Sequence, residues 1–112
     1  MKIVYVAGPF RGVNAWEIEQ NIRRAEQLGM KVALAGAMPL IPHANTRFFH
    51  GTLGDEFWLD GTLELLRRCD AIIMTDDWRR SSGATAEREE AIARHMPVFE
   101  SNEINLLERW AK

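Results

Sequence analysis

The hydrophobic pattern begins with an unbroken run at residues 2–7, Lys-Ile-Val-Tyr-Val-Ala, which is rich in β-branched and aromatic side chains. Gly8 and Pro9 follow it immediately. A short apolar run that stops at a glycine and a proline is typical of a buried strand that ends in a turn. We therefore predict a strand over residues 2–7 and a loop directly after it.

The pattern then changes to a helical period. From Ile18 to Val32, apolar or small residues recur at steps of three and four, which marks one face of a helix. Asn14 is a good N-cap and Gly36 a good stop, so the helix is expected over about 14–35. An alternative ends the helix at Gly29 and makes 31–34 a strand. The unbroken face favours the long helix, with Gly29 allowing close packing against the sheet.

Further strands are expected at 38–41, 71–74 and 97–99. Pro39 cannot donate a backbone hydrogen bond, which weakens the prediction of strand 38–41 unless the strand lies at a sheet edge. Residues 71–74, Ala-Ile-Ile-Met, are wholly apolar and indicate a strand buried on both faces.

Helices are expected between and after these strands. The first of them should direct Leu59, Leu63 and Leu66 inward. Two polar stretches without periodicity predict loops, and the first of these is longer than most connections. The predicted helices are 57–68, 84–95 and 103–111, and the predicted loops are 43–55 and 75–83.

Strand and helix thus alternate four times along the chain. This alternation predicts parallel strands joined by right-handed crossovers, in an open three-layer α/β sandwich formed by a single domain over residues 1–112. In such folds ligands bind beyond the carboxyl ends of the strands, where the strand order reverses. The loops that follow the strands are therefore the places to look for chemistry.

Composition narrows the classes of function. The chain has 112 residues, 46% of them hydrophobic, and a net charge of −2. The balance of charges argues against nucleic acid as a partner, and no apolar run approaches the length that crosses a bilayer. Cys69 is the only cysteine and no secretory signal is apparent, so a cytoplasmic location is expected. No spacing of cysteine and histidine suits a metal.

The first loop reads Gly8-Pro9-Phe10-Arg11-Gly12. Gly8 and Gly12 would let the backbone approach a ligand, and the Arg11 guanidinium could bind a phosphate. A plain turn with Arg11 in solvent is the alternative. The loop matches neither the dinucleotide-binding fingerprint nor the P-loop.

The loop after the third expected strand offers a second anion site. Ser81, Ser82 and Gly83 precede a helix, whose first backbone N–H groups are free to bind an anion. Trp78 could stack on a base or pack beneath the loop, and Phe10 in the first loop is the other candidate to lie along a base. Glu87 follows in the helix, where it could serve chemistry or only stabilise the helix start.

His43 lies near the end of the second expected strand. It could contact a base or a phosphate. The alternative is a surface histidine without a role.

Several strings together resemble the nucleoside 2-deoxyribosyltransferase superfamily. They are Ala-Gly-Pro-Phe-Arg-Gly at 7–12, Cys-Asp-Ala-Ile at 69–72, and Ser81-x-Gly83-x-x-x-Glu87. The stretch from Trp78 to Glu87 is most similar to small bacterial and phage members of that group. The resemblance covers nearly the whole chain and implies a flavodoxin-like or Rossmann-like fold with a parallel sheet of four to five strands.

The resemblance also implies an activity. It makes Glu87 a nucleophile that attacks the anomeric carbon of a nucleoside or nucleotide and forms a covalent glycosyl intermediate. A serine at position 81 and an arginine in the first loop resemble the members that hydrolyse nucleoside 5′-monophosphates. An N-glycosidase without a cofactor, assembled as a homodimer or homotetramer, is the leading hypothesis. A base-exchanging deoxyribosyltransferase and a non-catalytic nucleotide sensor are the alternatives.

One position departs from the family pattern. Relatives often carry an aspartate that protonates the leaving base eight residues before the position of Asp70, and here that residue is Thr62. Asp77, at the carboxyl end of a strand, is the best-placed substitute. Asp55 and Asp60 are the other nearby candidates. Either the acid has moved or the reaction differs.

Overall fold

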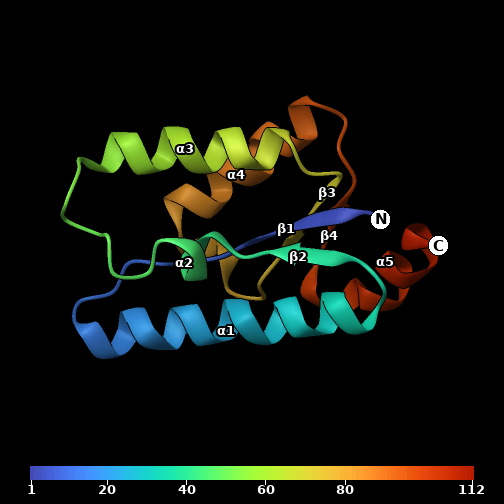
Figure 1. Ribbon diagram of the computed structural model, residues 1–112, viewed down its shortest axis with the longest axis horizontal. Coiled ribbons are helices and arrows are strands. Elements are labelled where there is room, and N and C mark those ends of the chain that lie inside the picture. Colours follow the sequence, from blue (N-terminus) through green and yellow to red (C-terminus); the bar gives the residue numbers. More distant parts are fainter.

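The computed structural model describes residues 1–112 and contains one sheet of four parallel strands in the order β2-β1-β3-β4 (Figure 1). Strand β1 pairs with β2 on one side, Ile3 opposite Met38, and with β3 on the other, Val4 opposite Ala71. The expected open parallel sheet of four to five strands is confirmed. The strands are β1 (Ile3–Ala7), β2 (Met38–Leu40), β3 (Ala71–Met74) and β4 (Val98–Phe99), and the helices are α1 (Ala15–Leu34), α2 (Pro42–Asn45), α3 (Asp55–Arg67), α4 (Ser82–Ala93) and α5 (Ile104–Ala111).

Helices cover both faces of the sheet, as the three-layer prediction requires. Figure 1 shows α3 and α4 on one side and α1 and α5 on the other. Alternate residues of β1 belong to two different cores: Val4 and Val6 join the cluster under α1 and α5, while Tyr5 and Ala7 join the cluster under α3 and α4. The alternation along β1 therefore sends Tyr5 toward α4.

The long first helix is confirmed. Its N-cap is Asn14, whose side chain accepts from the Glu17 N–H at 2.9 Å. Gly29 lies against Ile41 and Pro39, and a side-chain carbon at Gly29 would overlap Ile41. Strand β2 contains Pro39 and lies at the edge of the sheet, the position that a strand with a proline requires.

The region around the second strand's end differs from its expected form. The stretch predicted as loop 43–55 starts with the short helix α2, because Pro42 at its first position favours helical backbone. Helix α3 starts two residues earlier than expected, and Leu59 is 40% exposed instead of inward. Among the three leucines expected inside, Leu66 is buried and Leu63 partly so, because only the later turns of α3 pack on the core.

Two other boundaries move. A 3₁₀ turn at Trp78–Arg80 interrupts the expected loop, and α4 starts at Ser82 and stops at Ala93, where the expected span was 84–95. His95 has a φ of 58°, which ends the helical path. The last helix follows a 3₁₀ turn at Ser101–Glu103. No helix is long and apolar enough to cross a membrane.

Candidate functional site

The candidate residues gather at the carboxyl edge of the sheet. The strand order reverses between β1 and β3, so the loops after these strands, here loop 1 (residues 8–14) and loop 3 (residues 75–81), flank the position where ligands bind in open parallel sheets. Gly8 touches Thr75 so closely that a side-chain carbon at Gly8 would overlap the threonine side chain. The glycine is therefore required for the two loops to meet.

A buried carboxyl lies beneath this edge. Glu87, on α4, is only 8% exposed, and the Tyr5 hydroxyl donates a hydrogen bond to its Oε2. Thr62, on α3, is close enough to both groups to affect their pKa values, and its hydroxyl donates to the Leu59 carbonyl oxygen at 3.1 Å. We call these three residues the Glu87 cluster.

Burial controls the charge of Glu87. It raises the pKa of the Glu87 carboxyl to about 7, although the hydrogen bond from Tyr5 and the nearby Thr62 hydroxyl offset part of the rise. The interpretation of Glu87 as a charge that stabilises the helix start is wrong, because Glu87 is the sixth residue of α4 and lies beyond the first turn, where the helix dipole has little effect. Burial and the neighbouring Glu87 also raise the pKa of Tyr5, so its hydroxyl keeps its proton. The carboxyl is thus poised to gain or lose a proton near neutral pH.

Two buried side chains hold loop 1 from below. His43 Nε2 lies 3.0 Å from the carbonyl oxygens of both Gly8 and Pro9, and Asn21 Nδ2 donates to those of Phe10 and Arg11 at 3.0 Å. In a trans peptide the N–H points away from the preceding carbonyl. With four successive carbonyls turned inward, the N–H groups of residues 10–12 are turned outward, and none of them bonds within the chain. Loop 1 therefore presents backbone donors suited to an anion.

The placement of His43 corrects one expectation and leaves another open. The histidine is 7% exposed, so the alternative of a surface residue is wrong. Burial lowers the pKa of its ring, and its Nδ1 has no partner. The contacts with loop 1 make it a support for the backbone, and no contact places it against a base.

Loop 3 is ordered by Asp77. The carboxylate accepts from the Thr75 hydroxyl at 2.8 Å and pairs with Arg80 at 3.0 Å and Arg24 at 3.6 Å. Burial alone would raise the pKa of Asp77, but the hydrogen bonds from Thr75 and Arg80 and the two guanidinium charges lower it overall. An ionised Asp77 is a poor proton donor, which argues against its role as the substitute acid.

Asn21 joins loop 1 to loop 3. Its side-chain oxygen accepts from Arg24 at 2.7 Å and from Arg80 at 2.8 Å, while its nitrogen binds loop 1. Asn21 is 3% exposed, and both its amide nitrogen and its amide oxygen are hydrogen-bonded. Asn21 thus sets the relative position of the two loops.

The start of α4 retains room for a ligand. Ser81 is the N-cap, and its hydroxyl oxygen accepts from the Ala84 N–H at 3.1 Å. Gly83 has an ordinary backbone, and only the Ser81 oxygen, at 3.8 Å, lies within reach of a side-chain carbon placed there. Ser82 is exposed beside it. The fold does not require a glycine at 83, and the open space is compatible with a phosphate.

The structure does not bring three of the predicted binding residues into one pocket. Trp78 is 8% exposed and its indole N–H donates to Glu100 at 3.1 Å. The Arg79 and Arg88 guanidinium groups lie over its ring, so Trp78 packs beneath the loop, which was the alternative to stacking on a base. Arg11 is exposed and pairs with Asp55 at 2.8 Å. Phe10 lies against His43 and His50, with ring centroids 6.0 Å apart in each pair.

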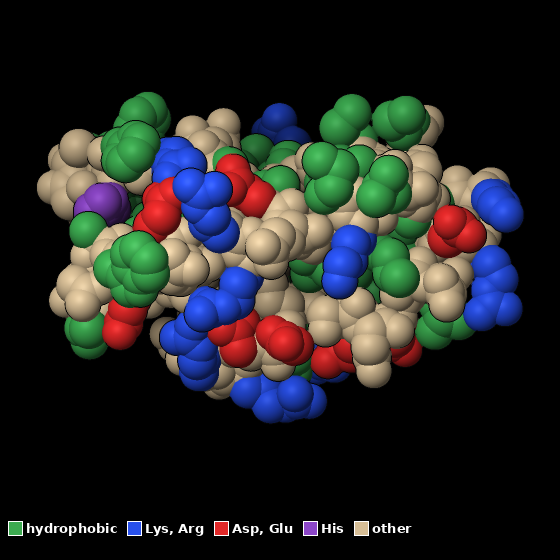
Figure 2. Space-filling model, turned by 90° about the horizontal axis from the view of Figure 1, so that it is seen from below, with side chains coloured by type: hydrophobic (Ala, Val, Ile, Leu, Met, Phe, Trp, Pro, Cys, Tyr) green, Lys and Arg blue, Asp and Glu red, His purple; other side chains and the backbone are tan.

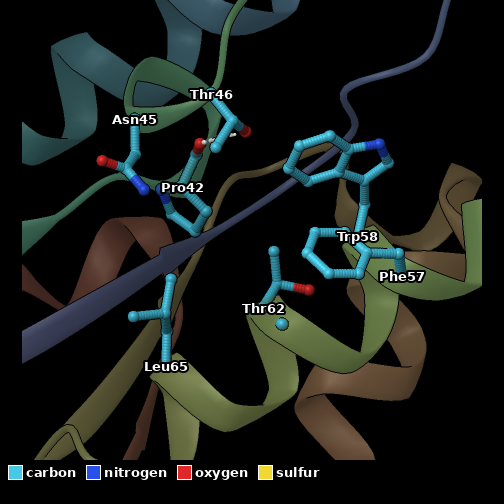
Figure 3. Close-up of a pocket in the computed structure, with 8 residues that line it drawn as sticks. Pro42, Asn45, Thr46, Phe57, Trp58, Thr62 and Leu65 are labelled. Atoms are coloured by element: carbon cyan, nitrogen blue, oxygen red, sulfur yellow. Dashed lines mark hydrogen bonds between the residues drawn. The ribbon is translucent and has the colours of Figure 1, made fainter. Parts of the chain in front are cut away.

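A pocket of about 160 Å³ opens between α2 and α3. Figure 3 shows the Phe57 and Trp58 rings on one side, Asn45 and Thr46 across from them, and Thr62 below. Thr62 belongs both to this pocket and to the Glu87 cluster, so it connects the two. We call this space the α2–α3 pocket, which is lined by Pro42, Asn45, Thr46, Phe57, Trp58, Gly61, Thr62 and Leu65.

Sequence reasoning missed two central residues. The sequence pattern predicts Tyr5 only as part of the strand core. A buried tyrosine hydroxyl needs a hydrogen-bond partner, and this need is the one signal that pointed to a buried polar group. Asn21 lies in the middle of α1, where a buried amide breaks the apolar face. Their partners are distant in the chain, so the sequence alone does not identify them.

Fold and site together define an α/β protein with a parallel sheet, two loops at the switch point and a buried carboxyl beneath them. A family model for a domain of unknown function, DUF7768, matches residues 2–101, and the chain belongs to this family. A comparison with curated protein sequences finds no match.

Proposed function

We propose that the protein is an N-glycosidase that cleaves the base–sugar bond of a nucleoside 5′-monophosphate through a covalent bond between the sugar and Glu87. The observation that carries the proposal is the Glu87 cluster, a buried carboxyl held by the Tyr5 hydroxyl beneath the carboxyl edge of the sheet. An ionised carboxylate in this position attacks the anomeric carbon, and water then hydrolyses the sugar ester. Tyr5 orients the attacking oxygen by its hydrogen bond.

The 5′-phosphate is assigned to the space between loop 1 and α4. Loop 1 offers the outward N–H groups of residues 10–12, and α4 offers its first N–H groups beside Gly83. Arg11 lies in the same loop and is held only by an exposed ion pair with Asp55, which a phosphate can replace at little cost. The base then occupies the α2–α3 pocket, next to Thr62.

Base release measured by chromatography tests the proposal. Incubation with a panel of nucleoside 5′-monophosphates should release base with the wild-type protein and not with Glu87→Gln. Glu89→Gln, an exposed carboxylate on the same helix, is the matched control and should retain full activity. Equal rates for wild type and Glu87→Gln would refute the nucleophile, and exchange of a second added base would make the protein a transferase.

Two further outcomes separate the alternatives. Tight nucleotide binding without base release would favour the nucleotide sensor. Arg11→Ala should weaken binding of a monophosphate much more than binding of the matching nucleoside, since the guanidinium is assigned to the phosphate. Equal losses for both ligands would remove Arg11 from the phosphate site.

We also propose that the active form is a homodimer or a larger homo-oligomer. Figure 2 shows hydrophobic side chains exposed at several places on one face, among them the end of the molecule that holds the start of α1 and the loop after α2. Phe48 is 75% exposed, Phe49, Leu53 and Phe57 are more than half exposed, and the rings of Phe49 and Phe57 both pack against Trp58. A second copy would cover these side chains near the α2–α3 pocket. A monomeric mass by light scattering at micromolar concentration would contradict this assembly.

A further inference from the structure

The α2–α3 pocket has no acid to protonate a leaving base. None of its eight lining residues is ionisable, and the one that affects the pKa of Glu87 is Thr62, whose hydroxyl is not an acid at neutral pH. A nucleobase such as adenine leaves as an anion unless a proton reaches it, and a positioned acid contributes about 10²–10⁴-fold to such steps. The pocket is therefore poorly suited to bases that must be protonated.

Five ionisable groups of the site do not line the pocket. Asp77 is ionised and held by two arginines, and Asp55 pairs with Arg11 in solvent. The Tyr5 hydroxyl is committed to Glu87, and the His43 Nε2 faces the loop 1 carbonyls. His50 packs against Phe10 and does not line the pocket.

The same pocket is suited to a positively charged ring. Phe57 and Trp58 line it with their rings 5.0 Å apart in an edge-on pair, and aromatic faces attract cations. No lysine or arginine lines it, so no positive charge repels such a ring. Asn45 offers an amide opposite the aromatic side, and an amide pairs with a carboxamide group through one donor and one acceptor. A cavity of about 150 Å³ accepts a single six-membered ring such as benzene.

We propose that the site cleaves the N-glycosidic bond of pyridinium nucleotides, a substrate class whose leaving group departs without a proton; this inference rests on the proposed function. In the first step an oxygen of the Glu87 carboxylate forms a bond to the anomeric carbon. The C–N bond breaks, and its electron pair neutralises the ring nitrogen, so a neutral pyridine leaves. In the second step water attacks the anomeric carbon, which gives the free sugar 5-phosphate, the Glu87 carboxylate and one proton.

The test compares two 5′-monophosphates that share ribose and phosphate and differ in the leaving group. The wild-type protein should release nicotinamide from nicotinamide mononucleotide at least about 100-fold faster than adenine from adenosine monophosphate, given the contribution of a general acid. Glu87→Gln should release neither. Similar wild-type rates for both substrates, each abolished by Glu87→Gln, would overturn the inference and leave the proposed function intact. Release from no monophosphate would overturn both.

Thr62 gives a second, independent readout. Thr62→Asp places a carboxyl beside Glu87, and two carboxyls at close range keep one of them protonated. This variant should raise the rate on adenosine monophosphate about tenfold or more, while Thr62→Asn, of similar size but without an acidic proton, should not. The same rise in both variants, or in neither, would show that the missing proton is not what limits cleavage of adenosine monophosphate.

Discussion

The buried carboxyl of Glu87 makes the stability of the fold depend on pH in a defined direction. The folded-state pKa is about 7, against 4.5 for the free side chain. Between these values the folded protein keeps a proton that the unfolded chain has lost, so stability falls as pH rises through this interval. A difference of about 2.5 pKa units corresponds to roughly 3 kcal/mol at pH values above 7.

Glu87→Gln isolates this contribution. Glutamine keeps an oxygen that accepts the hydrogen bond from Tyr5, and it never ionises. The variant therefore does not lose stability as the pH rises through the interval in which Glu87 of the wild type does. Urea unfolding, followed by the fluorescence of the four tryptophans, gives the free energy of unfolding of both proteins from about pH 4 to about pH 8. The variant should gain up to roughly 3 kcal/mol relative to wild type across that range, most of it between pH 4.5 and 7.

The control and the refuting result are both measurable in the same series. Glu89→Gln changes an exposed carboxylate, so its difference from wild type should stay nearly constant with pH. A constant difference between Glu87→Gln and wild type would show that Glu87 titrates in the folded state as it does in the unfolded chain. The argument that burial poises this group near neutral pH would then fail.

Further outcomes follow for the site. Gly83→Ala should raise the free energy of unfolding by about 0.5–1 kcal/mol, measured by urea unfolding, because the fold has room for the added methyl group. The same methyl group would occupy space assigned to the phosphate, so base release should fall, and unchanged activity would remove Gly83 from the site. Base release should rise with pH through about 7, since the attacking carboxylate must be ionised, and stay level above that; a fall at higher pH would reveal a proton donor. Asn21→Ala should raise the KM for a monophosphate by tenfold or more, because loop 1 would lose its support, and should change the KM for the matching nucleoside much less. Equal effects on both substrates would show that Asn21 contributes only to the stability of the fold.

Local pattern was enough to predict most of the fold. The spacing from Ile18 to Val32 identified α1, and the apolar run 71–74 identified the central strand β3. Pro39 made an edge position the condition for β2 to form, and β2 lies at the edge. These features depend on neighbours within one element, which the sequence displays directly.

The site was less predictable because its contacts join distant elements. Glu87 could be picked from its motif, but its burial depends on Tyr5 in β1 and on the packing of α3. Trp78 pairs with Glu100, which lies 22 residues away, and its packing under loop 3 follows from that contact. Asn21 meets Arg80 across 59 residues. No local pattern encodes such pairs.

The attack by Glu87 can be observed most directly as a sugar bound to the protein. The wild-type protein is mixed with a nucleoside 5′-monophosphate from the panel, quenched in acid during turnover, digested and analysed by mass spectrometry. The account predicts one pentose phosphate added to the peptide that contains Glu87, and no adduct with Glu87→Gln. Base release without any adduct on that peptide, or an adduct at another residue, would contradict the assignment of Glu87 as the nucleophile.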